Sequence, residues 1–285
     1  MEIYLITQKR IITEVNRQEN NLRRAEELVE EGNRIYEQAY SKVASYAGET
    51  EYRLSKHMDF KKDIIRELNG NIATSLKEFR SFNIESRIIN YSTMQKNSIN
   101  FNTAQDLNKF NSSISSFIRT PDILMKSISD MFISDEDYYA ARCKRDEARM
   151  YKDDMKRERE RLYFYKEKMS EIRSFMDSEK NELNILMSKL RQMISDLKRG
   201  MQKVNYSNQE AEYLKAIHKI AEDLSNLLLT EFLTDNFFIS QRYTKAFENI
   251  KKINENLPSS PSITDTNTLR VIARILGGNL WLYQN

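Results

Sequence analysis

An apolar residue occupies every seventh position between residues 141 and 197. The row consists of Ala141, Ala148, Met155, Leu162, Met169, Met176, Leu183, Leu190 and Leu197. A seven-residue repeat of this length is typical of a long α-helix that packs against another helix as in a coiled coil. We therefore expect one continuous helix from about residue 136 to residue 199. Glu158 and Glu179 interrupt the second row of the repeat, which indicates places where the partner helix is polar or absent.

Glycine and proline are scarce, with six and three residues among 285. Average usage of about 7% and 5% would give roughly 20 glycines and 14 prolines. Sandwiches, barrels and doubly wound α/β folds need such residues in their turns. The sequence therefore predicts an all-α protein, an elongated helical bundle with long antiparallel coiled-coil hairpins.

Breaks in the apolar pattern divide the chain into four segments. Residues 1–82 are predicted to form an N-terminal helical hairpin, whose first helix ends at Gly48 because glycine readily adopts the left-handed conformation after a helix. Residues 83–133 are rich in Ser, Asn and Thr, which weaken helices, so we expect short helices there. Residues 134–257 are predicted to form the long coiled-coil hairpin. Residues 258–285 should comprise a linker, a short helix and an apolar tail.

Two of these segments carry further detail. In residues 1–47 a row with seven-residue spacing contains Val15, Leu22, Val29, Tyr36 and Val43. A companion row is interrupted by polar residues, namely Glu19, Glu26 and Asn33. In the long hairpin, the return helix should begin near residue 208 and break near residue 235.

No catalytic or cofactor-binding motif is found in the sequence. No glycine-rich phosphate loop opens a helix, and neither His57 nor His218 follows a glutamate by three positions, as a di-metal helical bundle requires. Cys143 lies within the heptad helix, which favours an ordinary helix position over a nucleophile. We therefore expect a protein that is not an enzyme and that binds neither metal nor cofactor.

The charge of the chain is nearly balanced, with 45 basic and 42 acidic residues. Residues 142–168 contain eleven basic and seven acidic residues with interleaved aromatic residues, a combination also found in single-stranded nucleic-acid binding. Opposite charges three positions apart, such as Asp153 with Lys156 and Glu158 with Arg161, favour a solvated helix face instead.

These patterns favour a structural or interaction protein, a coiled-coil subunit of a larger assembly such as a scaffold, a virion or a secretion apparatus. One alternative is a helical dimer that binds or remodels a membrane surface. A second is single-stranded nucleic-acid binding through residues 142–168. The expected partners are other proteins or further copies of the chain, while a membrane surface is less favoured and nucleic acid least.

The apolar seam, as we call the row from Ala141 to Leu197, is expected to bind another helix. The predicted return helix offers few apolar residues opposite its far half, and an uncovered apolar stripe needs a partner. The apolar C-terminal tail could act as an aromatic anchor. The predicted interaction residues are therefore Met155, Leu162, Met169, Met176, Leu183, Leu190, Leu280, Trp281 and Tyr283.

Targeting signals are also not recognised. The N-terminus lacks the long apolar run of a signal peptide. The most apolar stretch, residues 224–239, is too short and too polar to span a membrane. We therefore expect neither a cleavable signal peptide nor a transmembrane helix, and a location in the cytoplasm or within an assembly.

Overall fold

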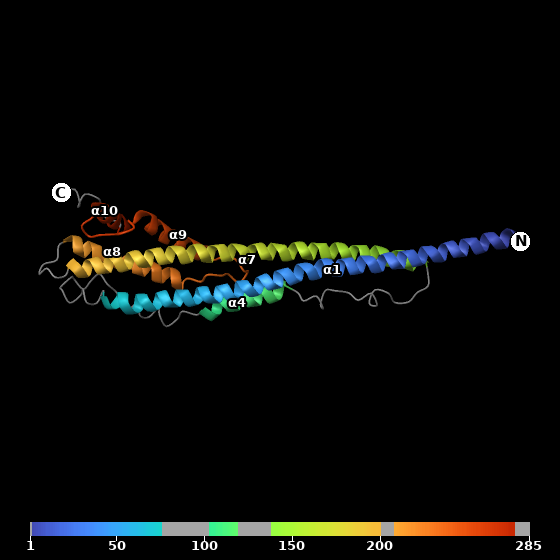
Figure 1. Cartoon of the computed structure of the whole chain (residues 1–285), viewed down its shortest axis with the longest axis horizontal. Coiled ribbons are helices and arrows are strands. Elements are labelled where there is room, and N and C mark those ends of the chain that lie inside the picture. The colour runs from blue at the N-terminus through green and yellow to red at the C-terminus, as the bar shows by residue number, and fades with distance from the viewer. Residues whose placement is uncertain (1, 76–102, 119–137, 201–207, 277–285) are drawn as a thin grey trace. The chain divides into compact units, whose positions relative to one another are not determined.

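The computed structural model describes residues 2–75, 103–118, 138–200 and 208–276 (Figure 1). Within these ranges the chain is α-helical, and the only β-type pairing there is an isolated bridge between Leu233 and Ile239. The predicted all-α class is confirmed. None of the helices so described is long and apolar enough to cross a membrane. The helices are α1 (Glu2–Glu67), the π-helical turn η1 (Leu68–Ile72), α4 (Thr103–Phe117), α7 (Tyr138–Gly200), α8 (Asn208–Leu229), α9 (Gln241–Asn256) and α10 (Thr266–Ile275).

Helix α1 is continuous where the sequence predicted a hairpin, so the predicted helix end at Gly48 is wrong. A Cβ atom at Gly48 would meet nothing within 4 Å. A glycine inside a helix costs only about 0.5–1 kcal/mol relative to alanine, and Ala47 and Thr50 on either side of it are buried. Packing of the flanking residues therefore outweighs the local preference of one glycine.

Helix α7 confirms the long helix that the apolar seam predicted. All nine seam residues are buried, and none exposes more than 4% of its surface. The expectation that part of this row is left uncovered is therefore wrong.

Two compact units divide the chain. The first unit combines residues 1–50 with residues 112–170, and the second combines residues 51–111 with residues 171–285. Helices α1, α4 and α7 each contribute to both units.

In the first unit, α1 packs against α7 and runs in the same direction. Three contacts join the helices: Asn21–Arg145, Glu31–Lys152 and Asn33–Tyr151. The residue numbers in these pairs differ by 124, 121 and 118. A nearly constant difference requires parallel helices, because in an antiparallel pair one number would fall as the other rises.

The second unit shows the same parallel pairing of α1 and α7. Three contacts carry it: Arg53–Asp177, His57–Glu179 and Glu67–Arg191, with differences of 124, 122 and 124. Helix α1, which the sequence assigned to a separate hairpin, thus packs against α7 in this unit as well. A long crossover between two helices permits parallel packing, whereas a short loop enforces antiparallel packing.

The shorter helices complete the second unit. Helix α8 contacts α9 and α10. Helix α9 lies on α7, where the ammonium group of Lys189 donates hydrogen bonds of 2.6 Å to the carbonyl oxygens of Asn254 and Leu257. A buried lysine of α7 therefore satisfies the free carbonyl groups at the C-terminus of α9.

Candidate functional site

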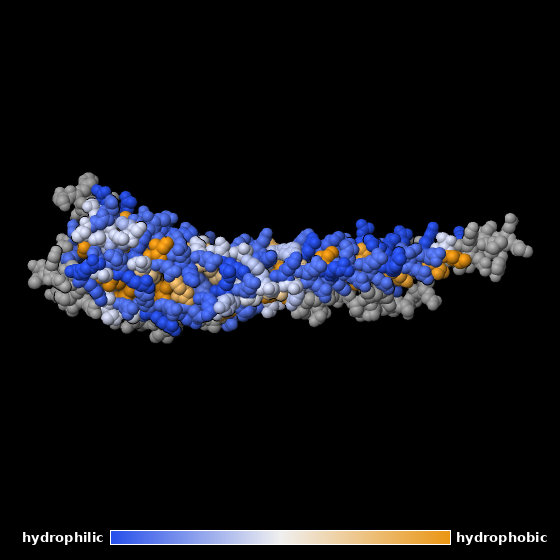
Figure 2. Space-filling model, viewed as in Figure 1, coloured by the Kyte–Doolittle hydropathy of each residue, from blue (hydrophilic) through white to orange (hydrophobic). Residues whose placement is uncertain are grey.

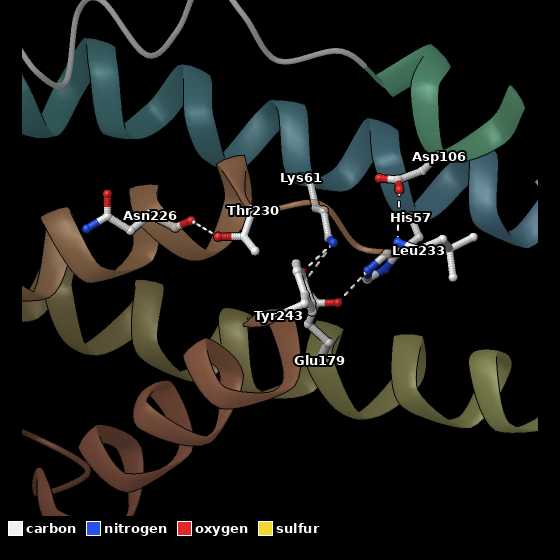
Figure 3. A network of polar contacts seen from close by, with 8 residues as sticks. All are labelled: His57, Lys61, Asp106, Glu179, Asn226, Thr230, Leu233 and Tyr243. Carbon is white, nitrogen blue, oxygen red and sulfur yellow. Dashed lines mark hydrogen bonds and ion pairs between the residues drawn. The ribbon is translucent and has the colours of Figure 1, made fainter. Parts of the chain in front are cut away.

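A buried polar network lies in the second unit, where the apolar pattern of α1 and α7 is interrupted (Figure 3). It consists of His57 and Lys61 of α1, Glu179 of α7 and Tyr243 of α9. The carboxylate of Glu179 accepts a hydrogen bond from His57 Nε2 at 2.9 Å and lies 3.3 Å from Lys61 Nζ. It also accepts from the Tyr243 hydroxyl, which in turn accepts from Lys61. One carboxylate therefore joins three helices.

The heptad spacing explains why these polar groups meet. His57 continues the seven-residue row that runs through Val43 and Thr50, and Lys61 continues the companion row through Ala47 and Leu54. All of the network side chains are at least 95% buried. The sequence left open whether the partner helix opposite Glu179 is polar or absent, and the structure places polar residues of α1 there.

Aromatic rings surround the ammonium group of Lys61. Its Nζ atom lies 4.2 Å from the ring centroid of Tyr243 and 4.6 Å from that of Phe232. These two rings contact each other edge to face, with centroids 5.1 Å apart. Cation–π attraction therefore adds to the ion pair with Glu179 in holding a lysine that water does not reach.

Burial and the charges within the network shift the pKa values of its side chains. Burial lowers the pKa of His57 and outweighs the hydrogen bond that His57 donates to Glu179, which raises it. Burial raises the pKa of Glu179, but the charge of Lys61 and the hydrogen bond from His57 outweigh it and leave that pKa below its ordinary value. Burial, followed by the Glu179 charge, raises the pKa of Tyr243. Burial also lowers the pKa of Lys61, against the charge of Glu179, which raises it. Because its pKa is lowered from 6.5, His57 is neutral near pH 7, and Lys61 lies within ion-pair distance of Glu179.

Helix α4 attaches the connection between α8 and α9 to this region. Asp106 accepts a hydrogen bond from the backbone N–H of Leu233 at 3.0 Å, and Lys109 donates one to the carbonyl oxygen of Leu233 at 3.2 Å. Within the connection, Phe237 adopts a left-handed backbone with φ 65°. Its buried ring packs 5.2 Å from that of Phe110 in α4. The strained turn is thus stabilised by contacts with α4.

A cleft of about 570 Å³ lies elsewhere in the second unit, between the ends of α1 and α7. Its lining includes Glu67, Arg191, Lys198 and Arg199. Arg191 is already bound to Glu67 through two hydrogen bonds of 2.5 and 2.6 Å. No network residue lines this cleft. Across the described ranges, no three His, Cys, Asp or Glu side chains gather in a way that could hold a metal ion.

The predicted interaction residues fall into two groups. The first, Met155, Leu162, Met169, Met176, Leu183 and Leu190, is buried against the chain's own helices. The second, Leu280, Trp281 and Tyr283, lies outside the described residues. The first group therefore lacks the uncovered surface on which its interaction role was predicted.

Other residues that the sequence analysis considered have ordinary positions. Cys143 is exposed on α7, and His218 is half-buried on α8. In residues 142–168, three ion pairs form between residues three positions apart, as on a solvated helix face. These pairs are Asp153–Lys156, Asp154–Arg157 and Glu158–Arg161. On the face seen in Figure 2, hydrophobic side chains form small separate groups among hydrophilic ones.

Sequence reasoning missed most of the network. Lys61 and Tyr243 were not identified as polar partners, and His57 was considered only as a metal ligand. Extending the two rows of α1 beyond Ala47 would have placed His57 and Lys61 at buried positions.

Protein-family models, curated proteins and solved structures were compared with the chain, and none matches. The function is therefore inferred from the geometry of this chain. In that geometry the four network side chains bind one another and join α1, α7 and α9. Such an arrangement fixes the relative positions of helices.

Proposed function

We propose that this chain is a non-enzymatic structural protein, a helical subunit that holds its partners at fixed positions within a larger assembly. The observation that carries the proposal is the parallel α1–α7 interface, where polar residues pair across the buried apolar rows. A polar residue among apolar interface positions lowers stability but selects one register, because every other register leaves it without a partner. A subunit that holds partners at fixed positions needs a single register, because a shift of one helix by a heptad would displace the partners bound to it.

Both units contain such a register-fixing pair. In the first unit the Tyr151 hydroxyl donates to Asn33 Oδ1 at 2.5 Å, and in the second Glu179 binds His57 and Lys61. The residues involved come from α1 and α7 in each case. Each pair supports a requirement for one defined alignment of α1 with α7 within its own unit.

The native mass of the protein tests the assembly role. The chain should be cross-linked in its source cells, purified gently, and its mass measured by light scattering and mass spectrometry. We expect a complex of defined stoichiometry, well above the 33.8 kDa of one chain. A chain that remains at the monomer mass at all concentrations and without cross-linked partners would contradict the proposal.

Two controls separate the alternative functions. Co-sedimentation with anionic liposomes that weakens with salt would favour a membrane-surface protein. Affinity for single-stranded nucleic acid that falls steeply with salt would favour the nucleic-acid alternative. The ion pairs within residues 142–168 give that alternative less support, because they neutralise part of the basic excess.

A further inference from the structure

The chain contains only two histidines, and one of them lies in the polar network. Histidine is the side chain whose ordinary pKa lies within the range of about pH 5 to 8. His57 is 5% exposed, whereas His218 is half-buried on α8. His218 therefore provides a matched control for any effect of pH on His57.

The charges around His57 come from several helices. Glu179 and Lys180 of α7, together with Lys61 of α1, act on it directly. Asp106 of α4 acts on Lys61 and on Tyr243 of α9. When His57 is neutral, Lys61 balances Glu179. A second proton on the ring would place two cations beside one buried carboxylate.

The hydrogen bond of His57 identifies the atom that takes the proton. Because the carboxylate of Glu179 can only accept, Nε2 of the neutral ring carries the hydrogen and donates it. The incoming proton must therefore bind at Nδ1. The ring then becomes a cation while it stays buried beside Glu179. The second positive charge destabilises the hydrogen bonds and the ion pair of the network.

We propose that this network is an acid-sensitive latch, in which uptake of one proton by His57 weakens the attachment of α9 to α1 and α7. Glu179 is the shared acceptor for His57, Lys61 and Tyr243. A charged His57 competes with Lys61 and Tyr243 for that carboxylate. Tyr243 is the residue through which α9 joins the network, so α9 is the helix whose attachment weakens there. The inference is independent of the proposed assembly role, because it concerns only contacts within the chain.

The direction of the pH effect follows from burial. We call the network closed when α9 is attached through Tyr243 and open when this attachment is lost. Burial lowers the pKa of His57 from 6.5 in the closed form, so the open form binds the proton more tightly. The contribution of His57 to closure is fully present above pH 6.5 and is lost as the pH falls from 6.5 through the lowered pKa. Each unit by which the pKa is lowered increases the opening constant about tenfold.

Hydrogen exchange of the full chain tests the latch. Exchange should be measured by mass spectrometry from about pH 7.5 to about pH 5, with correction for the intrinsic chemical rate. We expect α9 to lose protection as the pH falls over this range, while residues 25–47 of α1 serve as the reference and keep theirs. Protection of α9 that does not depend on pH would overturn the proposal.

Two variants assign the effect to one ring. His57→Gln retains an amide donor for Glu179 but cannot take up the proton, so the response of α9 to pH should disappear. His218→Gln should leave the response unchanged. A wild-type response in the His57→Gln variant, or its loss only in the His218→Gln variant, would exclude the latch.

A measurement on the wild-type protein tests the proposal even if a variant fails to fold. Histidine-selective isotope labelling gives two sets of ring signals, which the His218→Gln variant assigns. We expect the ring of His57 to titrate below 6.5. Titration of His57 at or above that value would contradict the inference, whatever the behaviour of the variants.

Discussion

Gly32 of α1 allows α7 to approach closely, and replacing it with alanine should destabilise the first unit. A Cβ atom at this position would lie 3.1 Å from Cε1 of Tyr151 and 3.4 Å from the Cα atom of Lys152. The ring of Tyr151 is buried, and its hydroxyl is bound to Asn33. The ring therefore cannot move away without weakening that hydrogen bond, and the backbone at Lys152 cannot move independently of α7.

The size of the effect follows from two opposing terms. Replacing a helical glycine with alanine gains about 0.5–1 kcal/mol, because the unfolded chain loses conformational freedom. Inserting a methyl group into a packed interface costs about 1–3 kcal/mol. We expect a net loss of about 1 kcal/mol for Gly32→Ala, the difference between these ranges.

Gly48 provides the matched control on the same helix and in the same unit. It lies inside α1, and its Cβ atom would meet nothing within 4 Å. Only the favourable term applies there, so Gly48→Ala should stabilise the protein by about 0.5–1 kcal/mol. Thermal unfolding followed by circular dichroism should therefore shift in opposite directions for the two variants, by about 2–4 °C per kcal/mol.

A second substitution tests the cause. In a Tyr151→Leu background the ring is gone, and Gly32→Ala should then be neutral or stabilising, as at Gly48. If Gly32→Ala alone raises the melting temperature as much as Gly48→Ala does, the close approach of α7 at this position does not limit the packing, and the reasoning is refuted.

Three further substitutions test other contacts by urea denaturation. Glu179→Leu leaves the buried ammonium of Lys61 without its carboxylate and should cost about 3–5 kcal/mol, most of it recovered when Lys61 is also replaced by leucine; a loss below about 1 kcal/mol would contradict the ion pair. Lys189→Met removes the donor to the last carbonyl groups of α9 and should cost about 2 kcal/mol, with faster amide exchange there; unchanged exchange would argue against this cap. Arg191→Gln breaks an exposed ion pair with Glu67 and should change stability by less than about 1 kcal/mol, so a larger loss would be unexpected.

The helices themselves could be predicted closely from the sequence. The expected helix from about residue 136 to 199 corresponds to α7, Tyr138–Gly200. The break expected near residue 235 corresponds to the connection between α8 and α9. Both predictions depend on spacing within one segment, which local geometry translates directly into a helix and its buried face.

Glycine was the local signal that misled the prediction. A break was placed at Gly48, where α1 continues, while Gly32 went unnoticed although α7 packs closely against it. In the sequence, Gly32 and Gly48 look alike, because both have the same conformational freedom. Only the neighbouring helix distinguishes a glycine that is needed for close approach from one that is merely tolerated.

The candidate site was predicted only in part. An acidic residue in an apolar row indicated that the partner helix at Glu179 is polar or absent, and the structure supplies His57 and Lys61. Their identity could not be read from the sequence, because they lie 122 and 118 positions away. To identify the partners of Glu179, one must know which helix packs against α7 and in which register.

By itself the sequence determined the all-α class, the continuous helix α7 and the residues that α7 buries, since these follow from a period within one stretch of chain. The tertiary structure decided that α1, which the sequence had assigned to a separate hairpin, packs in parallel against α7. Apolar stripes are interchangeable, because burial depends on area and has no direction, so periodicity alone cannot choose among the available helices. The polar pairs Asn33–Tyr151 and Lys61–Glu179 do have direction and exact partners. They form only when α1 and α7 lie in one alignment, which is why the structure was needed to find them.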